Sequence, residues 1–240
     1  MAQKVAIFDL DDVLVINIQW YWARWDMFKY VMSSLGFEET DVGFIEKLNE
    51  HDMANLTNKG FYSECFGDSM GETYLHFCKE SGREPDMTHY EAIKHIGHSV
   101  FDHRPIPYSG ARKTLELLKS MGTPVYCVTK GDEKNQLRKL RESKLEGFFD
   151  EIHVVQADKR TALAEIMEKH PGLAPNDFFF VGNSFRGDIL PALDLDITPV
   201  WIPVETWDFE DHGIDDLDAE LRNKIVVLDN IGEVSSLFKT

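Results

Sequence analysis

Cysteine and long apolar runs are scarce in this chain. It holds three cysteines, Cys65, Cys78 and Cys127, which lie far apart and form no C-x-x-C pair. Such an odd, scattered set argues against structural disulfides and against a cysteine-rich zinc site, so we expect buried free thiols. No stretch approaches the roughly 20 apolar residues that span a bilayer. Acidic residues soon interrupt the first hydrophobic run, unlike in a signal peptide, and we expect a cytoplasmic protein.

Basic residues are also few. The 240-residue chain has 25 Lys and Arg against 42 Asp and Glu, a formal net charge of −17. Such a field repels the phosphates of nucleic acids and membranes, so neither is an expected partner. A small phosphorylated substrate remains compatible, because a metal ion and a few local cations can override the field inside a cleft. The nine histidines form no H-x-x-x-H pair and no mixed His/Cys spacing suited to zinc. The expected oligomeric state is a monomer or a homodimer.

Short β-rich runs alternate with segments of helical periodicity over most of the chain. This alternation predicts βαβ units, and therefore an α/β fold with a doubly wound parallel sheet. In such sheets ligands bind beyond the carboxyl ends of the strands. The predicted strands are residues 4–8, 124–128, 152–155, 178–181, 199–202 and 225–228, and the helices between them are 111–121, 134–143, 160–170 and 188–195.

Residues 15–105 break this alternation. They contain few β-branched runs and long helical stretches such as Gln19–Leu35 and Met70–Ser81. The pattern predicts a helical domain inserted after the first strand. The expected domains are an α/β core of residues 1–14 and 106–240 and a helical insert of residues 15–105.

Two further segments favour a structural interpretation. Tyr21, Trp25 and Phe28 fall at helical spacing and most simply form the core of the insert, with an aromatic wall facing a substrate as the alternative. The acidic segment 208–220 predicts a solvated loop and a short helix.

Two carboxylates follow the first predicted strand. Asp9 and Asp11 come directly after Val5–Phe8, where the chain leaves extended geometry. At that spacing one carboxylate can attack a substrate while the other moves a proton, or both can hold a hard cation. An Asp-rich turn is the structural alternative.

Two later strand ends carry groups that can bind an anion. Thr129, Lys130 and Gly131 offer a hydroxyl and backbone donors, although the same turn also suits a helix N-cap. Lys159 opens the helix after the next strand, where the helix dipole is already positive, so a nearby anion would relieve the conflict. An exposed lysine paired with Asp158 is the alternative.

The strand at 178–181 also ends in polar residues. Gly182 permits a close backbone approach, and Asn183 and Asp188 supply oxygen atoms of the kind that Mg²⁺ accepts. A tight turn would explain the same residues without a ligand.

In this order, the four strand-end motifs resemble the haloacid dehalogenase superfamily, and in particular its phosphoglycolate- and flavin-mononucleotide-phosphatase-like members. The resemblance covers residues 1–14 and 106–240, and the helical insert occupies the position of that family's C1 cap. It implies a Rossmann-like core and a Mg²⁺-dependent phosphatase acting on a small phosphorylated metabolite.

The same resemblance assigns a role to each motif residue. Asp9 would attack phosphorus and form an aspartyl-phosphate, while Asp11 would protonate the leaving oxygen and then activate water. Thr129 and the backbone N–H of Lys130 would bind phosphoryl oxygens, and Lys159 would offset their charge. The implied Mg²⁺ ligands are Asp9, Asp11, Asn183 and Asp188.

Asn183 departs from the family pattern, since many relatives carry Asp at that position. An amide oxygen can bind Mg²⁺ but brings no negative charge. Two other activities stay open: a phosphomutase of the β-phosphoglucomutase type, and a 2-haloacid dehalogenase. The dehalogenase is less favoured, because a halide leaves without a proton and Asp11 would then be superfluous.

Overall fold

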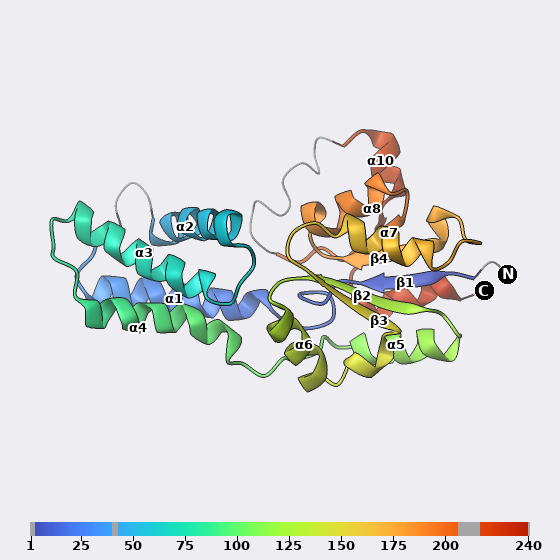
Figure 1. Cartoon of the computed structure of the whole chain (residues 1–240), viewed down its shortest axis with the longest axis horizontal. Coiled ribbons are helices and arrows are strands. Elements are labelled where there is room, and N and C mark those ends of the chain that lie inside the picture. The colour runs from blue at the N-terminus through green and yellow to red at the C-terminus, as the bar shows by residue number, and fades with distance from the viewer. Residues whose placement is uncertain (1–2, 40–42, 206–216, 240) are drawn as a thin grey trace. The chain divides into compact units, whose positions relative to one another are not determined.

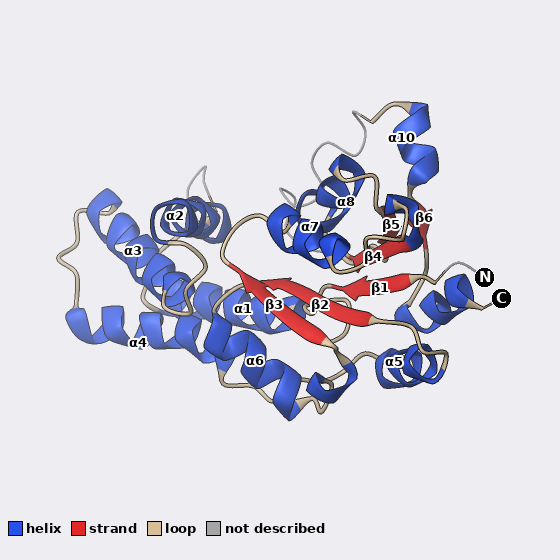
Figure 2. Ribbon diagram, turned by 45° about the vertical axis from the view of Figure 1, so that its right-hand side comes forward, coloured by secondary structure: helices blue, strands red, loops and turns tan. Residues whose placement is uncertain are grey.

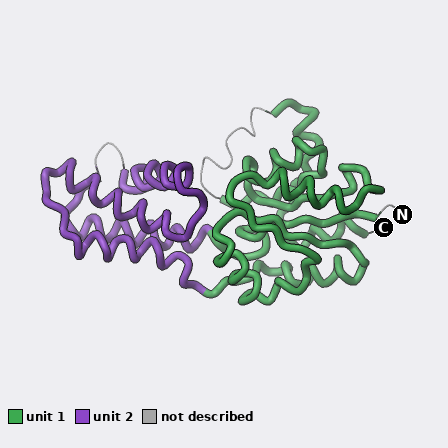
Figure 3. Tube along the Cα trace, viewed as in Figure 1, with its two compact units in different colours: residues 1–17, 104–240 green, residues 18–103 purple. Residues whose placement is uncertain are grey.

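The computed structural model describes residues 3–39, 43–205 and 217–239. The chain divides into two compact units, residues 1–17 with 104–240 and residues 18–103 (Figure 3). These divisions lie a few residues from the expected 14/15 and 105/106 boundaries.

The backbone N–H of Ile16 donates to Ile106 O over 2.9 Å, and that of Tyr108 donates to Leu14 O over 2.9 Å. The two connecting segments therefore pair with each other inside the larger unit.

The larger unit is built on a six-stranded parallel sheet, in the order β3-β2-β1-β4-β5-β6. β1 lies between β2 and β4, so the strand order reverses beside it, and this confirms the predicted doubly wound fold. The strands are β1 Val5–Phe8, β2 Val125–Lys130, β3 Glu151–Val155, β4 Phe178–Gly182, β5 Thr198–Trp201 and β6 Val226–Val227.

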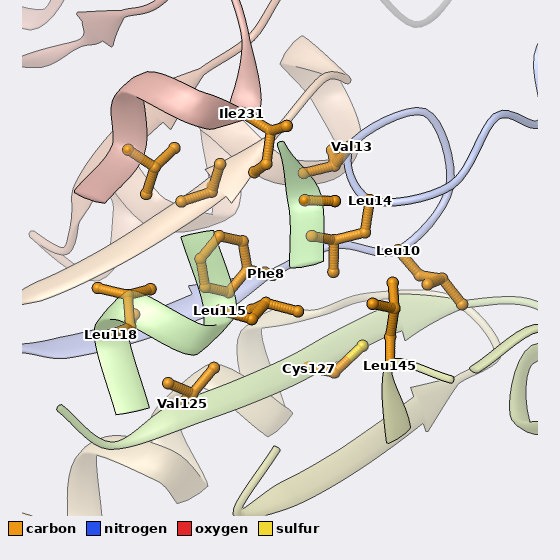
Figure 4. Close-up of a cluster of buried hydrophobic side chains, with 14 of the residues drawn as sticks. Phe8, Leu10, Val13, Leu14, Leu115, Leu118, Val125, Cys127, Leu145 and Ile231 are labelled. Atoms are coloured by element: carbon orange, nitrogen blue, oxygen red, sulfur yellow. The ribbon is translucent and has the colours of Figure 1, made fainter. Parts of the chain in front are cut away.

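Helices cover both faces of this sheet (Figures 1 and 2). Alternate side chains of β1 point to opposite faces, so that Phe8 packs in one core cluster and Ile7 in the other. Figure 4 shows the Phe8 side, where Leu115 and Leu118 contribute to the same cluster as Cys127. The elements on the Phe8 side are α5 Ala111–Ser120, α6 Glu133–Glu142 and η5 Ile231–Phe238, and those on the Ile7 side are α7 Arg160–Glu168 and α8 Leu190–Asp194.

Short helical segments complete this unit. The π-helix η4 Phe185–Ile189 leads directly into α8, and α10 Ala219–Lys224 precedes β6. The predicted acidic loop falls mostly on residues 206–216, which lie outside the described part of the chain. The remaining short helices are η2 Glu146–Phe148 and η3 Pro175–Asp177.

The smaller unit is helical and has its own core. Phe28 is fully buried, and Tyr21 and Trp25 pack partly buried against the same cluster, so the aromatic stripe does contribute to the core of the insert. Its elements are α1 Ile18–Ser34, α2 Phe44–Lys59, α3 Cys65–Glu80, α4 Met87–His98 and η1 Ser99–Phe101.

The three cysteines are free and buried. Across the described segments, none of the helices is long and apolar enough to cross a membrane.

Candidate active site

The carboxyl ends of β1, β2 and β4 meet at the point where the strand order reverses. Asp9 and Asp11 follow β1, Thr129 lies at the end of β2, and Asn183 follows β4. Lys159 precedes α7 on the chain that leaves β3. The predicted motifs therefore share one edge of the sheet.

A buried lysine joins two of the predicted carboxylates. The Lys159 ammonium lies 2.7 Å from Asp9 Oδ1 and 2.7 Å from Asp188 Oδ1, and only 4% of its side chain is exposed. Burial raises the pKa of the Asp9 carboxyl to about 7; the charges of Asp188 and Asp11 act in the same direction and Lys159 opposes them. Burial alone would lower the pKa of Lys159, but the two carboxylates outweigh it and raise that pKa. The arrangement holds two buried carboxylates against one cation, which suits a further positive charge.

Asp188 is held mainly by its own turn. Its Oδ2 accepts hydrogen bonds from the backbone N–H groups of Asn183 (3.1 Å) and Ser184 (3.0 Å), while Lys159 donates to Oδ1. A side chain at Gly182 would place its Cβ 2.2 Å from Asp188 Cβ, so only glycine permits this approach. Asp188 was also predicted as a metal ligand, and this stays a prediction: both of its oxygens accept hydrogen bonds, but a carboxylate oxygen can accept more than one contact. These hydrogen bonds tie Asp188 to Lys159 and to the Asn183 turn.

A second buried lysine holds Asp11. The Lys139 ammonium lies 2.8 Å from both Asp11 oxygens and 3.0 Å from Asn17 Oδ1. Its side chain is 4% exposed and that of Asp11 is 21% exposed. The backbone N–H of Asn17 in turn donates to Asp12 Oδ1 over 2.8 Å. Asp9 and Asp11 thus have separate cationic partners.

The anion-binding turn after β2 is tied to the same group. Gln136 Nε2 lies 2.6 Å from Thr129 Oγ1 and 3.0 Å from Asp11 Oδ2. Because Thr129 Oγ1 accepts from the amide, its own hydroxyl proton is left to donate to a ligand. Gly131 has φ of +149°, a conformation that favours glycine, and it directs the chain into α6. Lys130, predicted to offer its backbone N–H, is half-buried beside this turn.

Three oxygens at this edge suit a hard cation. Within the described residues, no group donates a hydrogen bond to Asp9 Oδ2, to the carbonyl of Asp11 or to the side-chain oxygen of Asn183. No cluster of three or more His, Cys, Asp or Glu side chains able to hold a metal occurs in that same part of the chain. A metal here would therefore depend on mixed oxygen ligands with one carboxylate, one carbonyl and one amide. Such ligands fit Mg²⁺ and do not fit zinc.

The residues that contact the Asp11 carboxylate and its lysine were not predicted from the sequence. Gln136 and Lys139 are buried polar residues three positions apart on α6, and Asn17 lies beyond the strand-end motif. The sequence offered one signal for Gln136 and Lys139, namely their helical spacing on the helix that follows the Thr129 turn. That spacing alone does not show which face of the helix meets the site.

Comparisons with known proteins identify solved structures with a similar fold. No curated protein sequence matches the chain. A haloacid dehalogenase-like hydrolase from Xanthomonas campestris has a similar structure, with a TM-score of 0.78, 21% identity, and coverage of 99% of this chain and 91% of that chain. A predicted phosphoglycolate phosphatase from Haemophilus somnus is also similar (TM-score 0.62, 17% identity, 99% and 98% coverage).

A third similar structure is an L-2-haloacid dehalogenase from Xanthobacter autotrophicus with chloropropionic acid covalently bound (TM-score 0.58, 15% identity, 99% and 98% coverage). At these identities the structures show a shared fold and leave the reaction open. The sequence comparison is more specific, since residues 6–202 match the family of haloacid dehalogenase-like hydrolases. The chain belongs to that family.

Proposed function

We propose that this hydrolase is a Mg²⁺-dependent phosphomonoesterase that forms an aspartyl-phosphate on Asp9. The observation that carries the proposal is the pair of carboxylates at the end of β1, each with its own lysine. Lys159 lies 2.7 Å from Asp9, and Lys139 lies 2.8 Å from Asp11. Two carboxylates in distinct surroundings suit two roles, a nucleophile and a proton carrier.

Each site residue has a task in such a reaction. Asp9 forms the new O–P bond while the leaving oxygen takes a proton from Asp11. Asp11 then removes a proton from water, which attacks phosphorus, releases inorganic phosphate and restores the Asp9 carboxylate. The Thr129 hydroxyl and the backbone N–H of Lys130 would bind phosphoryl oxygens, and Lys159 would offset the charge beside Asp9. Phosphoryl transfer depends mostly on such alignment and charge stabilisation.

A divalent cation fits the three oxygens to which no described group donates a hydrogen bond. Asp9 Oδ2, the Asp11 carbonyl and the Asn183 amide would hold Mg²⁺. When bound, the ion would reduce the repulsion between the Asp9 carboxylate and an anionic phosphate. Since Asn183 is neutral, these three ligands include a single charged side chain.

A dehalogenase is the main alternative on this fold. In that reaction a carboxylate attacks carbon and a halide leaves as a stable anion, so no proton has to be supplied. The Asp11 carboxylate and its hydrogen bonds from Lys139 and Gln136 would then have no task in the first step. A phosphomutase would use the same first step but would return the phosphoryl group to sugar rather than to water.

Product analysis separates these reactions. The purified protein should release inorganic phosphate from members of a panel of phosphorylated metabolites in Mg²⁺, lose this activity in EDTA, and regain it when Mg²⁺ is restored. Asp9→Asn should be inactive, because an amide is a poor nucleophile. Chloride release from 2-chloropropionate without phosphate release from any ester would overturn the proposal. Isomerised sugar phosphate without free phosphate would assign a phosphomutase.

A further inference from the structure

We propose that Lys139 and Gln136 position Asp11 for proton transfer by holding its Oδ2 and leaving Oδ1 to face the leaving group. The inference rests on the proposed function, since it assigns the geometry of the proton carrier in that reaction. It concerns two residues of α6 that lie 128 and 125 positions from Asp11 along the chain.

The Lys139 ammonium contacts three acceptors. They are the two Asp11 oxygens at 2.8 Å, which lie close enough together to share one N–H group, and Asn17 Oδ1 at 3.0 Å. The residue is buried, and a buried ammonium is costly unless it is fully paired. Asn17 is itself fixed, because its backbone N–H donates to Asp12 Oδ1. The lysine is therefore held on both sides, and its position constrains Asp11.

The two oxygens of Asp11 are not equivalent. Oδ2 accepts from both Lys139 (2.8 Å) and Gln136 (3.0 Å), whereas Oδ1 accepts from Lys139 alone. Turning Oδ2 toward a substrate would break two hydrogen bonds, and turning Oδ1 would break one. The anchored oxygen is thus Oδ2, and Oδ1 is the oxygen that can exchange its ammonium contact for a leaving-group oxygen.

Gln136 sets this geometry relative to the anion-binding turn. The same amide nitrogen lies 2.6 Å from Thr129 Oγ1 and 3.0 Å from Asp11 Oδ2. A phosphoryl oxygen bound by Thr129 would consequently have a fixed relation to the Asp11 carboxylate. Fixed geometry of this kind is what a general acid needs in the transition state.

Leaving groups of different stability test the proposal. p-Nitrophenolate leaves with little need of a proton, whereas the alkoxide of glycerol 2-phosphate must be protonated. The parameter kcat/KM includes only steps up to departure of the leaving group, so it reports on this protonation. For Lys139→Met, the ratio of kcat/KM for glycerol 2-phosphate to that for p-nitrophenyl phosphate should fall about tenfold or more, because general acid catalysis contributes about 10²–10⁴-fold. The exposed Lys134→Met variant on the same helix should keep the wild-type ratio.

A double-mutant cycle shows whether Lys139 acts through Asp11. In an Asp11→Asn background, Lys139→Met should change kcat/KM by less than about twofold, because the group it positions is already absent. Independent, multiplicative losses would overturn the proposal. Should Lys139→Met not fold, the ratio between the two esters for Gln136→Leu provides the test. Gln136 also contacts Thr129, which would bind the phosphoryl group of both esters, so only a fall in that ratio reports on the donor lost from Asp11 Oδ2.

A purely structural role gives a different pattern. Loss of folded enzyme lowers kcat/KM for both esters equally and leaves their ratio unchanged, and that result for both variants would refute the positioning role alone. A wild-type protein that releases phosphate from no ester of the metabolite panel, or an Asp9→Asn variant that retains activity, would instead refute the proposed function and this inference with it.

Discussion

At the scale of single residues, burial of the charged Asp9 carboxylate lowers the stability of the folded protein. Burial raises its pKa to about 7, and the nearby charges of Asp188 and Asp11 add to this effect, with only Lys159 opposing it. The ordinary value is 3.8. At this carboxyl the folded protein therefore binds more protons than the unfolded chain between about pH 4 and pH 7, so the contribution of Asp9 to the free energy of unfolding falls as pH rises through this range.

Replacing Asp9 by Asn should remove this cost. We expect the metal-free Asp9→Asn variant to be more stable than the wild type at pH 8, by about 1–3 kcal/mol, with a smaller difference at pH 5, where Asp9 is protonated. Urea unfolding in EDTA at the two pH values measures this. Glu168→Gln, which changes an exposed carboxylate at the end of α7, should show no such pH-dependent gain. Lower stability of Asp9→Asn at pH 8 would mean that the pairing of Asp9 with Lys159 outweighs the burial cost.

At the scale of elements, the turn after β4 depends on close contact between Gly182 and Asp188. A Cβ at Gly182 would lie 2.2 Å from Asp188 Cβ and 2.4 Å from its Oδ2. The contact allows Asp188 to accept from two backbone N–H groups while it also holds Lys159. The length and direction of this turn therefore set the position of the lysine beside Asp9.

Gly182→Ala should displace Asp188 and disturb this turn. We expect a loss of about 1–3 kcal/mol in the free energy of unfolding, as for overpacking elsewhere, together with a large loss of activity. Gly172→Ala is a matched control, because an added Cβ there meets no atom within 4 Å and the backbone φ is not positive. Thermal unfolding and phosphate release measure both effects. A fully active Gly182→Ala variant would show that the site tolerates a displaced Asp188.

The strands and the residues at their ends were predictable, because β-branched and aromatic runs mark buried parallel strands and the ends of those strands converge. The contacts of Gln136 and Lys139 with Asp11 were not predictable. Helical periodicity identifies a face of α6 but not the partner that it meets, and Asp11 lies more than 120 residues away in the chain. The hydrogen bonds of Asp188 were not predictable either, since sequence alone does not show which backbone N–H groups meet its oxygens.

At the scale of the whole molecule, the chain joins two units with separate cores. All of the predicted site residues belong to the α/β unit, and the helical unit begins at Ile18, directly after Asn17 of the Asp11 network. Within the helical unit, Trp20 stacks on His103 with ring centroids 4.4 Å apart, and Arg24 Nη2 donates to Ser99 O over 2.7 Å. These contacts hold the first and last parts of the helical unit together. The two segments that connect this unit to the α/β unit, residues 14–16 and 106–108, also pair with each other.

This organisation predicts that the helical unit selects the substrate without supplying the core chemistry. Trp22→Ala and Phe61→Ala change half-buried aromatic side chains, and they should alter the ranking among phosphate esters by severalfold. The same variants should change kcat/KM for p-nitrophenyl phosphate much less. Phe28→Ala is the reference for a purely structural loss, because Phe28 is fully buried and its truncation should cost about 3–5 kcal/mol. If Trp22→Ala and Phe61→Ala lower all activities in parallel and lower the melting temperature as Phe28→Ala does, then these two aromatics serve packing and do not select the substrate.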